Sequence, residues 1–259
     1  MVPPFFQTEI GDGPLVACAV HAGHAVCPEV EELLLLDAAQ RRYEEDPYTD
    51  EWASIAPTRL VGCRSRFEVD LNRPRDTAVY RRPEDAWGLN LWKSPPPAEL
   101  VARSLSGYDG FYKELRRVLD QLVSRHGLVV VFDLHSYNHC RHGLDRPADP
   151  TENPEINVGT GSMDRARWQR IVERILIELR GCDFLGRRLD VRENVRFRGG
   201  HLPTWIHANY PQSVCAPAIE AKKFFMNEWT GELDRTKFDA LQQALAQAAA
   251  ATLDELKTM

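Results

Sequence analysis

The sequence predicts an α/β protein in which helices cover both faces of a mixed, largely parallel sheet, forming a three-layer α/β/α sandwich. Two observations support this prediction. Short apolar runs rich in β-branched residues occur at residues 15–20, 128–134 and 214–219, and such runs are typical of buried strands. Segments with helical periodicity lie between these runs, and this alternation indicates helices packed on both faces of the sheet.

The N-terminal half contains the first buried strand, one predicted helix and two short strands. Residues 29–45 are predicted as a single helix because their apolar side chains recur on one face. Asp46-Pro47 ends it, since proline lacks a backbone donor and restricts the residue before it. The two short strands are expected at residues 59–63 and 66–71.

The C-terminal half alternates in the same way. An amphipathic helix is predicted at residues 108–125, and Gly127 suits the left-handed cap that closes a helix. The second buried strand follows directly. Further helices are expected at residues 164–179 and 233–256, on either side of the third apolar run.

The composition fits one soluble domain spanning residues 1–259. Its 43% hydrophobic and 27% charged residues are ordinary for a globular protein, and the length suffices for a sizeable core. A formal net charge of −6 gives no reason to expect nucleic acid or an anionic membrane as a partner. The sequence shows neither a run of about 18 apolar residues nor a signal-peptide pattern, so we expect a cytoplasmic location. The oligomeric state stays open.

Each apolar run leads into a side chain that can bind a metal or transfer a proton, namely His21, His135 and Glu220. Ligands of parallel sheets bind beyond the carboxyl ends of the strands, so these three side chains are expected in one crevice. Two histidines and a carboxylate there suggest metal-assisted hydrolysis with zinc. The alternative for a single histidine is a structural role at a strand end, and for Glu220 an ion pair with Lys222 or Lys223.

A catalytic zinc usually has three protein ligands, so one ligand remains to be assigned. Residues 46–52 supply the carboxylates that lie between the two histidines in the sequence. Asp50 is the first choice for the third ligand, with Glu51 and His24 as alternates. A helix cap or a solvated acid is an equally common role for either carboxylate.

Basic residues lie in two further polar segments. Arg66, Asn72 and Arg73 belong to the first, and Arg196 opens a loop with paired glycines. Guanidinium groups bind carboxylates in bidentate geometry, and asparagine adds hydrogen-bond donors. We expect Asn72, Arg73 and Arg196 to bind a small anionic substrate that resembles an amino acid.

Taken in order, these motifs resemble the N-formylglutamate amidohydrolase family over roughly residues 15–231. The matching segments are His21-Ala22-Gly23, Asp50-Glu51-Trp52, Ser65-Arg66, Asp70-Leu71-Asn72-Arg73, Asp133-Leu134-His135-Ser136, Asn157-Val158-Gly159-Thr160, Arg196-Phe197-Arg198-Gly199-Gly200 and Ile219-Glu220. The resemblance implies a phosphorylase/hydrolase-like fold, related to the zinc carboxypeptidases and to deacylases of the succinylglutamate desuccinylase and aspartoacylase type. It also implies one zinc ion per chain.

The same resemblance implies roles for individual residues. Asn72 and Arg73 are expected to clamp the substrate carboxylate, Arg66 to polarise the carbonyl and Glu220 to act as the catalytic base. We therefore expect a zinc-dependent hydrolase of an N-formyl or other N-acyl amino acid, such as N-formyl-L-glutamate, which yields formate and the free amino acid. The acyl group stays open.

Two other functions remain as alternatives. One is a carboxypeptidase-like hydrolase of a small peptide, and the other is a non-catalytic protein that binds a small acidic ligand. The joint presence of His21, His135 and Glu220 argues against the second alternative, because a binding protein needs no base.

Overall fold

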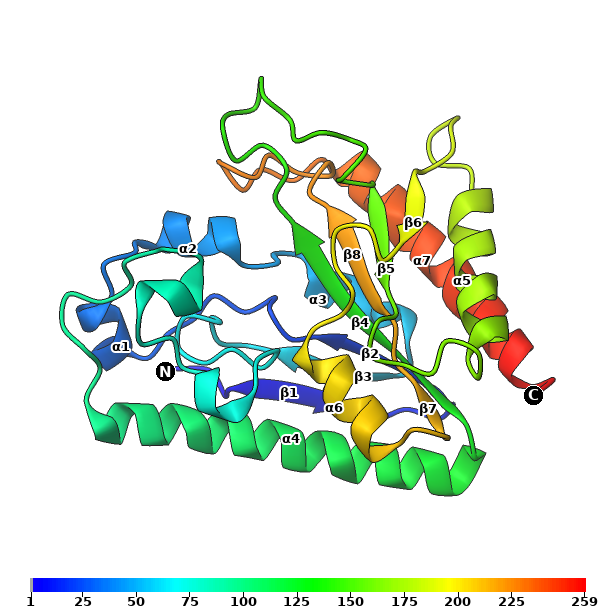
Figure 1. Cartoon of the computed structure of the whole chain (residues 1–259), viewed down its shortest axis with the longest axis horizontal. Coiled ribbons are helices and arrows are strands. Elements are labelled where there is room, and N and C mark those ends of the chain that lie inside the picture. The colour runs from blue at the N-terminus through cyan, green and yellow to red at the C-terminus, as the bar shows by residue number, and fades with distance from the viewer. Residues whose placement is uncertain (1) are drawn as a thin grey trace.

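The computed structural model describes residues 2–259 and is built around a sheet of eight strands (Figure 1). Seven of them follow the order β1-β3-β2-β4-β8-β5-β6, and β7 pairs with β4. The strands are β1 (Phe6–Glu9), β2 (Leu15–Ala19), β3 (Thr58–Gly62), β4 (Val129–Tyr137), β5 (Ile156–Gly159), β6 (Val191–Glu193), β7 (Val214–Cys215) and β8 (Ala218–Lys222).

The sheet is mixed and its centre is parallel, as predicted. Strands β2, β3, β4, β7 and β8 share one direction. Strand β1 runs antiparallel at one edge, while β5 pairs antiparallel with β8 and parallel with β6. The parallel strands bring their carboxyl ends to one edge of the sheet, where ligands of such sheets usually bind.

Helices cover both faces, so the predicted three-layer sandwich is confirmed. The helices are α1 (Pro28–Leu33), α2 (Ala38–Glu44), α3 (Thr49–Trp52), α4 (Ala98–His126), α5 (Gln169–Gly181), α6 (His201–Asn209) and α7 (Arg235–Leu256), and 3-10 turns occupy Ala53–Ile55, Arg75–Thr77 and Pro83–Ala86. Side chains of β2 alternate between the faces: Leu15 and Ala17 share a core with α5 and α7, whereas Val16 and Cys18 share another with α4 and α6. Figure 1 shows α4 opposite the α5–α7 pair. In the part of the chain that the structure describes, no helix is long and apolar enough to cross a membrane.

The single helix predicted for residues 29–45 is wrong, because the chain forms α1 and α2 with a break between them. The backbone N–H of Leu35 bonds to Leu91 O at 2.7 Å, so the break is stabilised by a segment far away in the sequence. Asp37 then starts α2 with a capping box. Its side chain accepts a hydrogen bond from Gln40 N at 2.8 Å, and the side chain of Gln40 accepts one from Asp37 N at 2.9 Å.

Two other boundaries differ from the prediction. The expected strand at residues 66–71 is a series of turns, in which Glu68 N and Val69 N bond to Ser65 O. Helix α4 starts ten residues before the predicted helix, even though glycine weakens the helical signal there. Gly107 has a packing reason, since a Cβ atom at this position would lie 2.4 Å from the Phe5 ring.

Helix α6 is attached to the sheet through His207, and this contact predicts a pH dependence of stability. His207 Nε2 accepts from Ala216 N at 3.0 Å, and its Nδ1 lies 2.9 Å from Ser162 Oγ. Burial lowers the pKa of His207 to about 4. Between about pH 6.5 and pH 4 the unfolded chain therefore binds a proton that the folded chain does not, and stability falls as the pH drops through this window.

We expect His207→Asn to reduce this pH dependence. Between pH 7 and pH 5 the free energy of unfolding of the parent should lose about 2 kcal/mol more than that of the variant. Urea unfolding of both proteins at several pH values measures the difference. If the free energy of unfolding changed with pH equally in the parent and the variant, His207 would not be the source of the pH dependence.

Candidate functional site

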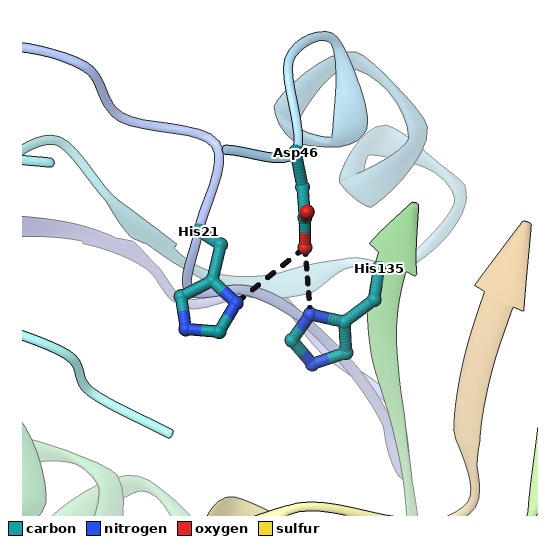
Figure 2. A group of neighbouring side chains, drawn as sticks. All are labelled: His21, Asp46 and His135. Atoms are coloured by element: carbon teal, nitrogen blue, oxygen red, sulfur yellow. Dashed lines mark hydrogen bonds and ion pairs between the residues drawn. The ribbon is translucent and has the colours of Figure 1, made fainter. Parts of the chain in front are cut away.

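Three buried side chains from separate parts of the chain converge at the carboxyl ends of β2 and β4 (Figure 2). His21 follows β2, His135 belongs to β4, and Asp46 lies between α2 and α3. One ligand atom of each residue lies within 4.8 Å of the others. Asp46 Oδ2 lies 2.8 Å from His135 Nδ1 and 3.5 Å from His21 Nδ1.

The backbone explains why these residues meet. His135 faces the α4–α6 side because it shares the strand alternation of Val129 and Val131, which pack there.

The loop of Asp46 is anchored to the end of β2, because the backbone N–H of Asp46 donates to His21 O at 3.0 Å. Buried Lys223 adds a second anchor, since Nζ donates to the carbonyls of Tyr43 and Glu45 at 2.8 and 2.7 Å.

Two further carboxylates orient the imidazole rings. His21 Nε2 lies 2.7 Å from Asp70 Oδ1, and His135 Nε2 lies 2.9 Å from Asp133 Oδ1. Both Asp70 and Asp133 are fully buried. If each Nε2 carries the proton and donates it to its carboxylate, both Nδ1 atoms are free to bind a cation, and carboxylate–histidine pairs of this kind are common around metals. Asp133 lies two residues before His135 on β4 and contacts its ring directly.

The electrostatics of this centre favour positive charge. Burial alone would raise the pKa of Asp46, but hydrogen bonds from His135 and His21 outweigh it and hold the pKa below its ordinary value. Burial alone would lower the pKa of His135, yet the carboxylates of Asp133 and Glu220 raise it well above the usual range. Carboxylates therefore stabilise a cation or an added proton between the two rings.

The donor set is compatible with a metal ion such as zinc. Imidazole nitrogen and carboxylate oxygen are preferred zinc ligands, and two such ligands of a tetrahedral zinc lie about 3.3 Å apart. The distances of 2.8 and 3.5 Å from Asp46 Oδ2 to the two Nδ1 atoms lie on either side of this value.

The structure does not bring Asp50, Glu51 or His24 to this centre. Asp50 and His24 are exposed, and Glu51 forms an ion pair with Arg235 at 3.0 Å. Thr49 explains the difference, because its hydroxyl donates to Asp46 O at 2.7 Å and starts α3, which carries Asp50 toward the surface.

Sequence reasoning interpreted Asp46 only as a helix stop and therefore missed it. The available signal was the pair Asp46-Pro47, since proline disfavours helical backbone at the residue before it. An acid held out of both neighbouring helices is free to turn inward.

A cavity of about 960 Å³ opens beside the centre and contains the other predicted residues. Its lining includes His21, Arg66, Asn72, Arg73, His135, Arg196 and Glu220. Residues predicted from distant parts of the sequence thus belong to one site.

Glu220 is aligned with His135 on the neighbouring strand. Both residues lie within their strands and not beyond them, because the pairing of β4 and β8 continues to Tyr137 and Lys222. Within residues 2–259 the carboxylate of Glu220 makes neither a hydrogen bond nor an ion pair, and Lys222 Nζ donates instead to Asn153 O at 2.7 Å. Burial raises the pKa of Glu220 to about 7.

Asp70 also positions one wall of the cavity. Its Oδ2 accepts from Arg66 Nη2 at 2.8 Å and from the hydroxyl of Tyr80. Asn72 Oδ1 accepts from Leu202 N at 2.7 Å, while Asn72 Nδ2 lies 3.2 Å from His135 Nε2. The side chain of Asn72 therefore lies between the ring of His135 and the start of α6.

The remaining arginines leave positive charge in the cavity. Arg73 Nε lies 3.9 Å from Asp70 Oδ2, which is a weak contact, and no ion pair engages Arg196 or Arg198 in residues 2–259. Asn157 Oδ1 accepts from Arg196 N at 2.8 Å, and Asn157 is paired with Glu220 across β5 and β8. This arrangement suits an anionic ligand.

Comparison with known proteins identifies the family and the fold. A family model described as N-formylglutamate amidohydrolase matches residues 13–225. The N-formylglutamate amidohydrolase of Ralstonia eutropha JMP134 is 18% identical, with a TM-score of 0.75 over 98% of this chain and 97% of that one. The gene product Atu2144 of Agrobacterium tumefaciens is also 18% identical, with a TM-score of 0.69 over 98% and 97% of the two chains. These structures share the fold. No curated protein matches the chain.

Proposed function

Because this chain belongs to the N-formylglutamate amidohydrolase family, we propose that it is a zinc-dependent hydrolase of N-acyl amino acids. The bond cleaved is the amide of an N-formyl or related N-acyl amino acid, with N-formyl-L-glutamate as the first candidate substrate. The observation that carries the proposal is the buried His21–Asp46–His135 centre, which shares one cavity with Glu220 and several arginines.

The zinc ligands in this proposal are Nδ1 of His21, Nδ1 of His135 and the carboxylate of Asp46. Zinc bound there supplies Lewis acidity, which polarises a carbonyl and lowers the pKa of water to about 7. Asp70 and Asp133 hold the two rings in the orientation that exposes Nδ1.

Glu220 is the proton carrier in this proposal. Its carboxylate makes no competing bond within residues 2–259 and is aligned with His135, so it can accept a proton from the attacking water. It then delivers this proton to the departing nitrogen, which must leave as an amine. Arg66 lies in the same cavity and is proposed to polarise the carbonyl.

The arginines define the substrate class. Arg73 is proposed to bind the α-carboxylate, and Arg196 with Arg198 to bind further negative charge. A carboxypeptidase-like reaction on a short peptide is a second candidate, because 960 Å³ is near the upper end of the roughly 300–1,000 Å³ usual for ligand sites.

Metal analysis and product analysis test the function together. We expect about one zinc ion per chain, loss of activity with a chelator and release of formate from N-formyl-L-glutamate. Release of a C-terminal residue from peptides, without hydrolysis of N-acyl amino acids, would favour the second candidate. A zinc-loaded protein that hydrolyses neither class would reject the proposal.

We expect Arg73→Lys to raise KM while kcat changes little. An ammonium group cannot reproduce a bidentate contact with a carboxylate. Hydrogen bonds to charged groups contribute about 1.5–3 kcal/mol, so KM should rise roughly tenfold to a hundredfold. Steady-state kinetics on an acidic N-acyl amino acid measures this change. An unchanged KM would remove Arg73 from the substrate site.

A further inference from the structure

Trp87 is a half-exposed aromatic residue on the wall of the cavity. Its side chain is 52% exposed, and it contributes to the same lining as the metal-binding centre. The residue follows the 3-10 turn Pro83–Ala86, and its backbone N–H bonds to Pro83 O. None of the roles assigned above uses this ring.

The backbone of Trp87 adopts a conformation that bulky residues rarely take. Its φ is +54°, in the left-handed region, and Gly88 follows with φ +90°. Glycine or asparagine is favoured at such a helix end, and a bulky residue there is strained. Strained residues of this kind concentrate at functional sites, which suggests that the ring of Trp87 has a use.

The ring lies against two of the cavity's arginines. The guanidinium carbon of Arg66 lies 4.8 Å from the centre of the Trp87 ring, and that of Arg73 lies 5.9 Å away. Tyr80 packs edge-on against the same ring at 6.0 Å. Guanidinium groups within about 6 Å of an indole ring are attracted to it, and tryptophan is the strongest of the aromatic partners.

These contacts matter most for Arg73, whose side chain is 37% exposed and has only the 3.9 Å contact with Asp70 as an ion pair. Without a neighbouring surface, such a side chain would sample many rotamers and stay fully hydrated. The Trp87 ring on one side and the Tyr80 ring, 5.8 Å from the Arg73 guanidinium carbon, reduce both its freedom and its contact with water, and this strengthens its attraction for a carboxylate.

We propose that Trp87 is a positioning residue that holds the guanidinium groups of Arg66 and Arg73 at the cavity and shields them from water. It thereby sets the affinity for the carboxylate of the substrate. This inference rests on the proposed function, which assigns binding of the substrate carboxylate to Arg73 and polarisation of the carbonyl to Arg66.

The test compares Trp87→Gly with Trp87→Phe and a matched control. Leu185 offers the control, since it is 54% exposed, has φ +53° and is also followed by a glycine in the left-handed region, yet it lies outside the cavity lining. Leu185→Gly therefore relieves the same backbone strain without touching the site. All variants are measured as zinc-loaded protein, with thermal unfolding as the check on folding.

We expect Trp87→Gly to unfold at the parent's temperature or above it, as Leu185→Gly should. Its KM for an acidic N-acyl amino acid should rise about tenfold, the size expected for two cation–π contacts. Its kcat should stay within about twofold, because Asp70 and Tyr80 still hold Arg66 through hydrogen bonds. Trp87→Phe should keep most of the parent's KM, and Leu185→Gly all of it. An unchanged KM in Trp87→Gly, or a loss that Phe does not restore, would overturn the inference.

Calorimetric binding of L-glutamate separates this inference from the proposed function. If the parent binds glutamate and Trp87→Gly binds it about tenfold more weakly, the inference holds even if no amide is hydrolysed. If the parent hydrolyses N-acyl amino acids while KM and glutamate affinity are the same in Trp87→Gly, the function holds and the inference fails. A parent that does not bind glutamate would also overturn the inference.

Discussion

Glu220→Gln should lower kcat by roughly 10²–10⁴-fold while zinc and substrate still bind. The amide keeps the shape of the side chain but cannot accept the proton of the attacking water. The carboxylate is aligned with His135 and has no other partner within residues 2–259, so little else changes when it is replaced. Zinc content, substrate affinity and kcat measured on one preparation check all three parts of this expectation.

Glu155→Gln is the matched control for this variant. Glu155 lies before β5 and forms an ion pair with Arg187 at 2.6 Å, away from the cavity. The same chemical change there should lower stability slightly and leave kcat near that of the parent. Near-normal turnover in Glu220→Gln would rule out Glu220 as the base.

Asp46→Asn should lower the affinity for zinc by more than about 100-fold. A residue that only orients a metal ligand typically accounts for 10–100-fold, and Asp46 is proposed to bind the metal directly. Its buried carboxylate also balances the charge of the two histidines, and the neutral amide cannot do so. Zinc competition with a chelator measures the affinity.

Asp50→Asn distinguishes the structural assignment from the one predicted from the sequence. Asp50 is exposed and lies on α3, so the variant should bind zinc like the parent. Weak zinc binding by Asp50→Asn together with normal binding by Asp46→Asn would reverse the assignment made here.

The sandwich could be predicted because its strands carry a strong local signal. The apolar runs that became β2, β4 and the β7–β8 segment are buried on both faces, and such strands read as continuous apolar sequence. The helix boundaries could not be predicted equally well. The break between α1 and α2 depends on a bond from Leu35 to Leu91, which no local pattern reveals.

The residues of the site likewise include some that the sequence predicts and some that it does not. That His21, His135 and Glu220 line one cavity could be predicted, because each is joined to an apolar strand and the ends of these strands meet at one edge of the sheet. Asp46 and Trp87 were missed because they lie in loops, where position depends on distant partners. Lys223 and His21 hold the loop of Asp46, while Arg66 and Arg73 lie against Trp87.

His21, Asp46 and His135 come from three distant parts of the chain, so the unfolded polypeptide does not hold these three ligands close together. Zinc held as proposed therefore binds the folded state more tightly than the unfolded chain and stabilises it by mass action. At a free zinc concentration about 1,000 times the dissociation constant, this stabilisation amounts to about 4 kcal/mol. With zinc held as proposed, the supply of zinc sets the stability of the folded chain as well as its activity.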